Sequence, residues 1–279
     1  MRGRGRRMKP EGSEPVLVSL ATLNTRGLPL TGTRRAERSA AIGVELESST
    51  IEVVGFQEVY TYHHLLLLRS HLPAFPHVAY ARTPVGPAGG VATFSRVPFT
   101  ETRFERFGRP REASGMRWRT RIMAGLNGSL ITRVTGYDLY IVNTHPIANM
   151  DGDWSETNRF YALQSSQYTA LTRLVGRLGP RVAVIGDFNA PRVSAVHTAL
   201  MDETGLRDTF GQQCPPTFHA EYLSGGREPQ CIDFILASGP LGVKHTELLL
   251  AEKVSMPGGA GFVSDHVGLR ADLLVPGPS

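Results

Sequence analysis

Residues 182–189, VAVIGDFN, place four apolar residues directly before Gly186, Asp187 and Asn189. A short run of valine, alanine and isoleucine that stops at glycine and aspartate is typical of a buried strand with a turn at its end. The stretch therefore predicts a core strand that presents a carboxylate and an amide at the point where it ends.

The same arrangement recurs along the chain. Apolar runs lie at residues 16–23, 51–56, 137–142 and 231–237, and a last run at 267–275 follows a polar tripeptide. The polar side chains at or near the ends of these runs are Asn24, Glu58, His145, Asp233, Asp265 and His266. Each of them alone has an ordinary explanation as a turn, cap or loop residue. Their combination indicates a functional site built from several strand ends.

Two segments between the predicted strands have helical spacing of apolar residues, at 34–47 and 155–178. Strands interspersed with helices predict an α/β fold in which sheets are covered by helices. At 279 residues and 41% hydrophobic composition, the chain is long enough for one large domain. We expect a single catalytic domain over residues 15–279, preceded by a basic, disordered tail over residues 1–14.

The positive charge is unevenly distributed. The net charge is +5, and residues 103–121 alone carry seven arginines against two glutamates. This segment could track a nucleic-acid backbone or meet anionic lipid head groups, and a solvated loop with local ion pairs is the structural alternative. Within it, Arg109 and Arg117 are candidate substrate contacts.

The sequence also favours one cellular compartment. Cys214 and Cys231 are its two cysteines, too few for a disulfide scaffold. No apolar stretch approaches the ~18 residues of a membrane span, and the run at 16–23 is short for a signal peptide. We expect the protein to be a cytoplasmic monomer, and the sequence does not imply a protein partner.

Carboxylates, amides and imidazoles at strand ends suit phosphoryl chemistry. Mg²⁺ takes oxygen ligands, commonly one or two carboxylates with waters and phosphate oxygens. Phosphodiester cleavage also requires a base for water and stabilisation of the charge that develops on the phosphoryl oxygens. Glu58, Asp187 and Asp265 fit the first need, while His145 and His266 fit the others.

Seven motifs occur in one order over residues 16–275. They are Leu23-Asn24-Thr25, Gly55-Phe56-Gln57-Glu58-Val59, the stretch 90–98, Asn143-Thr144-His145, Gly186-Asp187-Phe188-Asn189, the stretch 232–236 and Ser264-Asp265-His266. In this order they resemble the endonuclease/exonuclease/phosphatase superfamily, to which deoxyribonuclease I-like enzymes belong. The resemblance implies a four-layer α/β/β/α sandwich of two packed, mostly antiparallel sheets flanked by helices, with the site at one end.

The resemblance implies a metal set and a catalytic set. Glu58 matches the principal metal carboxylate, assisted by Asn24 and Asp265, with Mg²⁺ as the expected ion and Mn²⁺ or Ca²⁺ as alternatives.

In the catalytic set, Asp187 and Asn189 match the pair that positions the nucleophile or stabilises the transferring phosphoryl group. His266 matches the general base on water, oriented by Asp233, and His145 matches a phosphate-contacting cation. Which of Asp187 and His266 starts the proton transfer stays open.

The substrate class follows from weaker features. The stretch 143–148, followed by Asp151, Asp153, Arg159 and Gln167, resembles the neutral sphingomyelinase-type branch, although Pro146 stands where that branch usually has leucine. This resemblance implies a phospholipid head group as substrate and an anionic membrane surface as partner.

Three alternatives remain. A deoxyribonuclease-like nuclease acting on nucleic acid fits the arginine-rich segment. An inositol-phosphate phosphatase fits less well, because Phe234 rather than arginine follows Asp233. A non-catalytic binding protein of the same fold is disfavoured by the complete set of site residues. Arg159 and His219 are further candidate substrate contacts.

Overall fold

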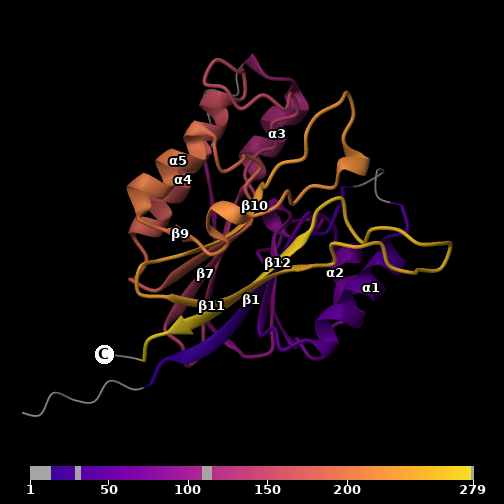
Figure 1. Ribbon diagram of the computed structural model, residues 1–279, viewed down its shortest axis with the longest axis vertical. Helices are drawn as coiled ribbons and strands as arrows, with labels where there is room; N and C mark the ends of the chain where they lie inside the picture. The colour runs from indigo at the N-terminus through magenta and orange to yellow at the C-terminus, as the bar shows by residue number, and fades with distance from the viewer. Residues whose placement is uncertain (1–13, 29–32, 109–114, 278–279) are drawn as a thin grey trace, which may run out of the picture.

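The computed structural model describes residues 14–28, 33–108 and 115–277, and in these ranges the strands form two six-stranded sheets (Figure 1). In the first sheet the strand order is β11-β12-β1-β2-β4-β3. Its strands are β1 (Val16–Asn24), β2 (Val53–Gln57), β3 (His77–Ala79), β4 (Ala92–Ser95), β11 (Gly242–Leu249) and β12 (Gly268–Val275).

The second sheet has the order β5-β6-β7-β8-β10-β9. Its strands are β5 (Phe99–Arg106), β6 (Gly128–Val134), β7 (Leu139–Thr144), β8 (Val182–Asp187), β9 (Arg207–Asp208) and β10 (Asp233–Ala237). In the described part of the chain, β1–β2 and β7–β8 run parallel and the other pairs run antiparallel. The expectation of two mostly antiparallel sheets is therefore confirmed.

Helices cover the two outer faces of the sheet pair (Figure 1). The α-helices are α1 (Arg35–Ser48), α2 (Tyr62–Ser70), α3 (Trp118–Leu126), α4 (Tyr161–Gly176) and α5 (Ala195–Thr204). Short 3-10 turns lie at η1 (Ala88–Gly90), η3 (Gly211–Gln213) and η4 (Ala220–Tyr222).

Three apolar cores hold the layers together. One joins α1 and α2 to the first sheet, a second joins α4 and α5 to the second sheet, and a third lies between the sheets. In the third core, Leu20 and Ala271 of the first sheet cluster with Ile185 and Ile235 of the second, and all four are 0% exposed. Apolar surface buried on both faces of each sheet gives the predicted α/β/β/α sandwich.

Strand direction brings the polar strand ends to one end of the sandwich. The parallel pairs β1–β2 and β7–β8 end at the same edge of their sheets, beside Asn24, Glu58, His145 and Asp187. Because β10 is antiparallel to β8, its first residue, Asp233, pairs with Asp187. The start of β12 likewise lies beside the end of β1.

One predicted helix begins later than the sequence indicates. The helix expected over 155–178 is α4, which starts at Tyr161. The preceding residues form a turn in which Asp153 accepts the Ser155 N–H and Asn158 accepts the Phe160 N–H. Asp and Asn side chains that bond nearby backbone groups compete with helix formation, which explains the shorter helix.

Two predictions lie outside the described residues. These are the tail over residues 1–14, apart from Glu14, and Arg109. Within the described ranges, no helix has both the length and the apolar character needed to cross a bilayer.

Candidate active site

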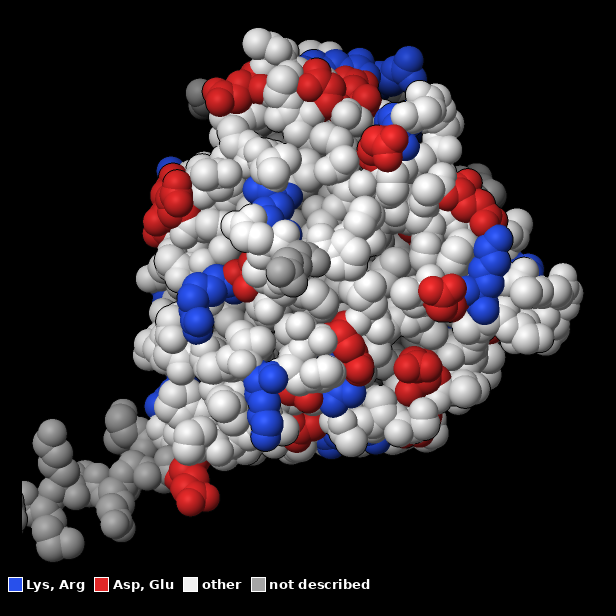
Figure 2. Space-filling model, viewed as in Figure 1, with Lys and Arg blue, Asp and Glu red and all other residues white. Residues whose placement is uncertain are grey.

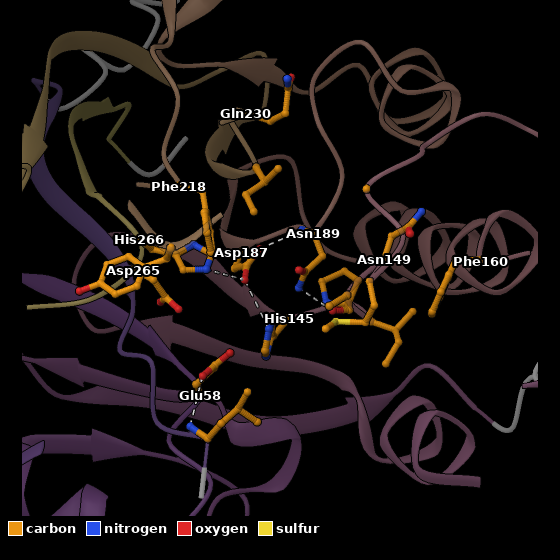
Figure 3. Close-up of a pocket in the computed structure, with 18 of the residues that line it drawn as sticks. Glu58, His145, Asn149, Phe160, Asp187, Asn189, Phe218, Gln230, Asp265 and His266 are labelled. Carbon is orange, nitrogen blue, oxygen red and sulfur yellow. Dashed lines mark hydrogen bonds and ion pairs between the residues drawn. The ribbon is translucent and has the colours of Figure 1, made fainter. Parts of the chain in front are cut away.

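Asp187 lies at the centre of the candidate site (Figure 3). It ends β8 directly after Gly186, whose φ of +144° and close approach to the Thr144 carbonyl leave no room for a Cβ. Its Oδ2 accepts a 2.9 Å hydrogen bond from the Asn24 amide and lies 3.5 Å from Nε2 of His145. The same oxygen lies 3.7 Å from Nε2 of His266. One buried carboxylate at the end of β8 therefore contacts residues from three other strand ends.

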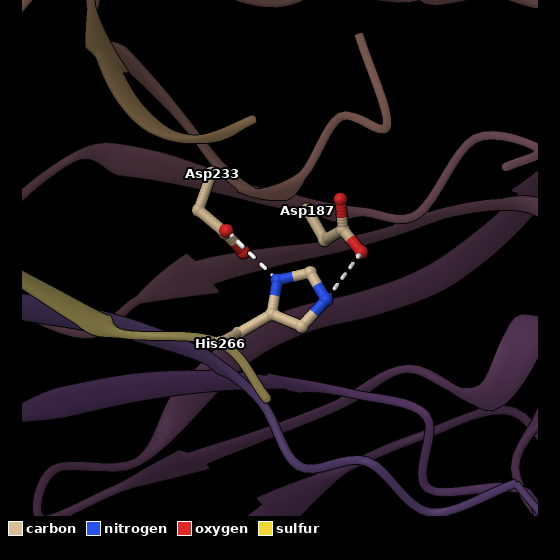
Figure 4. Close-up of side chains that lie close together, drawn as sticks. All are labelled: Asp187, Asp233 and His266. Atoms are coloured by element: carbon tan, nitrogen blue, oxygen red, sulfur yellow. Dashed lines mark hydrogen bonds and ion pairs between the residues drawn. The ribbon is translucent and has the colours of Figure 1, made fainter. Parts of the chain in front are cut away.

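His266 lies between two carboxylates (Figure 4). Its Nδ1 is 2.9 Å from Oδ2 of Asp233, on the side away from Asp187. The hydroxyl of Thr217 accepts the backbone N–H of Asp233, and the Phe218 ring packs edge-on against the imidazole with centroids 4.9 Å apart. These contacts fix the orientation of the ring and leave Nε2 directed toward Asp187 and the pocket.

The electrostatics of the group follow from this geometry. Burial alone would raise the pKa of Asp187, but His266, His145 and the Asn24 amide lower it to about 2. Burial raises the pKa of Asp233 to about 6, with His266 opposing the rise. For His266 burial acts downward, yet the charges of Asp233 and Asp187 outweigh it and hold the pKa well above its ordinary value. The two carboxylates therefore favour the protonated imidazole.

His145 is held by the end of β7 and by the loop before β6. Burial opposes its protonation, but the hydrogen bond and charge of Asp187 raise its pKa. The Asn127 amide donates to the His145 carbonyl, and the Tyr60 hydroxyl lies 3.5 Å from Nδ1 of His145. A protonated imidazole at this position can contact an anionic phosphate.

Asn189 has a conformation that few residues adopt. Its φ is +53°, and its backbone N–H donates to Asp187 Oδ1 at 2.8 Å. Its side-chain amide donates to the carbonyl of Pro146, the position at which the sequence departs from the sphingomyelinase-type pattern. Asparagine tolerates left-handed backbone better than most non-glycine residues, and these hydrogen bonds hold Asn189 in that conformation.

Glu58 and Asp265 add two more carboxylates to the pocket lining, with Asp265 beside His266 and Glu58 near His145 (Figure 3). Glu58 follows β2 with a φ of +60°, and its carboxylate accepts the Leu28 N–H at 3.3 Å. Burial raises the pKa of Glu58. The negative charges of Asp265 and Asp187 raise it further, and the two histidines partly oppose this rise. Asp265 is balanced by Arg26 at 3.4 Å.

These oxygen donors fit a hard divalent cation. Glu58 and Asp265 both line the pocket, and the cost of holding their charges near Asp187 is what a bound cation would relieve. Asn24 is fully buried. Its Oδ1 accepts a hydrogen bond from the Arg26 N–H, and its amide donates to Asp187. In the structure it braces Asp187 directly.

A second grouping also has metal-like geometry. One ligand atom each from Asp187, Asp233 and His266 lies within 4.8 Å of the others. We favour the oxygen set for the cation, because Glu58 and Asp265 both line the pocket that a phosphate can enter, whereas Asp233 does not line it.

The charged groups form the floor of a pocket of about 900 Å³. Its walls are largely apolar and include Met123, Ile147, Met150, Trp154, Phe160 and Phe218. A charged floor under apolar walls suits an amphiphilic phosphate ester, because apolar lining provides most of the buried contact in ligand pockets and a few polar groups fix orientation.

The structure places the remaining candidates outside this pocket. Arg159 is bound to Asp151 in a two-point ion pair, beside a smaller hollow that Arg117 also lines. His219 stacks on Phe262 with ring centroids 3.7 Å apart and donates its backbone N–H to the Asp265 carbonyl. Gln167 is buried and bonds the Ile147 N–H and the Ala124 carbonyl, a structural role.

Sequence reasoning missed several supporting residues. Tyr60, Asn127, Thr217 and Phe218 contact the histidines or Asp233, although none of them ends a predicted strand. Thr217 and Phe218 lie directly before His219, which the sequence predicts as a candidate substrate contact, so the sequence points to their segment but not to them. For Tyr60 and Asn127 the sequence carries no comparable signal.

Comparisons with known proteins find relatives by sequence and by structure. A curated relative is the inositol phosphosphingolipids phospholipase C of Saccharomyces cerevisiae, 25% identical over 231 residues that cover 72% of this chain and 47% of the relative. The chain thus spans about half the length of that protein.

Solved structures share the fold at lower identity. TDP2 from D. rerio, complexed with a single-strand DNA product, is 16% identical with a TM-score of 0.68, over 92% of this chain and 98% of that one. Sphingomyelinase C from Streptomyces griseocarneus is 18% identical with a TM-score of 0.64, over 92% and 99% of the two chains.

The sequence model of one family matches residues 21–266, which include every strand-end residue of the site. This chain belongs to the endonuclease/exonuclease/phosphatase family.

Proposed function

We propose that this protein is a divalent-metal-dependent phosphodiester hydrolase that acts on phospholipid head groups. Members of its family are hydrolases of phosphoester bonds and generally depend on a divalent metal. One observation carries the proposal. Asp233 contacts His266, His266 contacts Asp187, and Asp187 contacts His145, in a buried chain of side chains at the floor of the pocket.

Each residue of the site has a distinct role in the proposed reaction. His266 accepts the proton of the attacking water at Nε2, while Asp233 fixes its tautomer and stabilises its protonated form. His145 and the side chain of Asn189 contact the phosphoryl oxygens as negative charge develops on them. Asp187 orients both imidazoles, and its low pKa keeps it ionised throughout the working pH range.

Glu58 and Asp265 would hold the cation, with Asn24 bracing Asp187. A bound Mg²⁺ would supply charge neutralisation at the phosphate and the leaving oxygen. A general base must be neutral, and a cation held by Glu58 and Asp265 would favour the neutral form of His266. Mn²⁺ and Ca²⁺ take oxygen ligands too and are alternatives that metal substitution can rank.

The apolar walls favour a lipid. A phospholipid places an acylated, apolar group next to its scissile phosphodiester, and side chains such as Trp154 and Phe160 would contact that group. The phospholipase and sphingomyelinase relatives support the same substrate class.

A nuclease is the second candidate, because of one specific observation. Arg119 lines the pocket and its guanidinium lies 5.3 Å from the Trp118 ring, a combination that can contact a phosphate backbone and stack on a base. The TDP2 structure, which contains a DNA product, supports this alternative.

The test is hydrolysis across a substrate panel. Purified protein is given bis-p-nitrophenyl phosphate with Mg²⁺, then sphingomyelin, glycerophospholipids, plasmid DNA and single-stranded DNA. An EDTA sample and His266→Gln are the controls. Metal-dependent release of lipid head groups that exceeds nucleic-acid cleavage supports the proposal, whereas cleavage of DNA alone assigns the nuclease function. No turnover of any phosphodiester overturns both.

A further inference from the structure

Helix α3 combines a face that lines the pocket with an apolar face that nothing in the described residues covers. Thr120 and Met123 line the pocket, and Ala124 is buried against Ile147 and Leu163. On the other side, Trp118, Ile122 and Leu126 are 64%, 52% and 41% exposed. Residues spaced by four lie on one side of a helix, so these three form a continuous outer stripe.

A fourth exposed apolar side chain extends the stripe. Met150 is 70% exposed and lines the smaller hollow together with Trp118. Met150 also lines the main pocket, so the apolar surface continues from the outside of the helix to the pocket mouth. We refer to Trp118, Ile122, Leu126 and Met150 as the docking face.

Helix α3 itself carries only positive charge. Residues 115–126 contain Arg117, Arg119 and Arg121 and no acidic residue. All three arginines are exposed, and the salt bridges seen within the described ranges do not include them. Acidic side chains also lie on this end of the molecule (Figure 2), but the nearest in the hollow, Asp151, is paired with Arg159.

We infer that the docking face binds the surface of an anionic phospholipid bilayer and thereby places the pocket mouth against the membrane. A short helix with tryptophan and aliphatic side chains on one face and arginines beside them has the composition of an interfacial helix. Its apolar side chains would enter the acyl boundary while the guanidinium groups meet lipid phosphates. The inference rests on the proposed function, since it assumes that the substrate lies in the bilayer.

Vesicle binding in the presence of EDTA tests the docking face without any contribution from hydrolysis. The probes are vesicles of phosphatidylcholine with phosphatidylglycerol, vesicles of phosphatidylcholine alone, and double-stranded DNA. The variant Ile122→Ser/Leu126→Ser removes two apolar side chains but keeps Trp118 as a fluorescent reporter. Val44→Ser/Leu66→Ser is the matched control, because Val44 and Leu66 are exposed apolar residues on α1 and α2.

We expect wild type and the control to bind anionic vesicles, with tryptophan emission quenched by lipids brominated in the acyl chain. The α3 variant should bind at least about tenfold more weakly, because two apolar side chains no longer leave water. Its thermal melting and its turnover of bis-p-nitrophenyl phosphate with Mg²⁺ should match wild type, since neither Ile122 nor Leu126 lines the pocket.

Equal vesicle binding by wild type and a folded α3 variant would overturn the inference, as would binding of wild type to DNA but not to vesicles. Failure of the proposed function gives a different result, which is absence of lipid turnover with vesicle binding intact.

Discussion

The imidazole of His266 and the carboxylate of Asp233 form a buried pair, with Nδ1 2.9 Å from Oδ2. Because Asp187 lies on the opposite side of the ring, the Asp233 contact determines which nitrogen faces the pocket. In the proposed mechanism this pair supplies the base for water, so it is the first relationship to test.

Removing either member of the pair should cost nearly as much as removing both. Asp233→Asn and His266→Gln are each expected to lower kcat by about 10²–10⁴-fold, because paired catalytic groups act as a unit. The measurement is kcat for the two single variants and the double variant. If the losses in activation free energy add, the two residues act separately and the pairing is wrong.

The same pair predicts a shift in the pH profile. Burial lowers the pKa of His266, but the carboxylate of Asp233 raises it and contributes to the net rise. Asp233→Asn removes that charge, so the acidic limb of kcat/KM should move to lower pH in the residual activity. Asp208→Asn is a control, since this half-buried carboxylate pairs with Arg192 away from the pocket. A limb that stays in place would show that His266 is not the titrating base.

Glu58 should link metal binding to stability. Glu58→Gln keeps the side-chain volume and removes a charge that Asp265 and Asp187 repel, so the fold is expected to persist without metal. Mg²⁺ should raise the melting temperature of wild type, because a ligand that binds only the folded state stabilises it. The rise should be much smaller in Glu58→Gln, whose activity falls. An equal Mg²⁺ response in the two proteins would place the cation elsewhere, and Asp233 and Asp187 would become the next ligands to test.

The strand-end residues of the site can be predicted from the sequence, whereas residues that reach the site from loops cannot. Asn24, Glu58, His145 and Asp187 were predictable because a strand end is visible as the point where an apolar run stops, and strand ends meet in a sandwich. Asn127 was not predictable, because its contact with the His145 carbonyl depends on how the chain returns between α3 and β6.

The arginine-rich segment was predicted only in part. The sequence shows that the segment is positively charged, but it does not show where each arginine side chain lies in the fold. Arg103 pairs with Glu101 and Glu105 on β5, whereas Arg119 lines the pocket. Some arginines of this segment therefore form local ion pairs and others line the pocket. Only the tertiary structure shows which role each arginine has.

Two substitutions of Asn189 should differ in stability because the backbone at this position is left-handed. Asn189→Ala and Asn189→Gly both remove the amide, but only glycine adopts a φ of +53° without a Cβ clash. We expect the alanine variant to be about 1 kcal/mol less stable than the glycine variant. Urea unfolding measures this difference, while kcat should fall in both variants because the amide that we propose contacts phosphate is gone. Equal stability of the two variants would contradict the strain, and unchanged kcat would remove Asn189 from the catalytic set.

A buried histidine that does not line the pocket should make stability depend on pH. His197 of α5 packs against Phe234, with ring centroids 4.5 Å apart, and its Nε2 has no partner in the described part of the chain. Burial, with Arg192 adding to it, lowers the pKa of His197 to about 4. Below its ordinary pKa of about 6.5, the unfolded chain therefore binds a proton that the folded protein does not.

The pH window follows from these two pKa values. Above about pH 6.5 the histidine is neutral in both states and stability does not depend on it, whereas stability is lost as pH falls toward 4, by up to about 1.4 kcal/mol per pH unit. His197→Leu removes the titration at similar volume. Urea unfolding at pH 7 and pH 5 should therefore show a smaller loss for the variant than for wild type, by up to about 2 kcal/mol. Parallel losses in the two proteins would mean that His197 is protonated in the folded state.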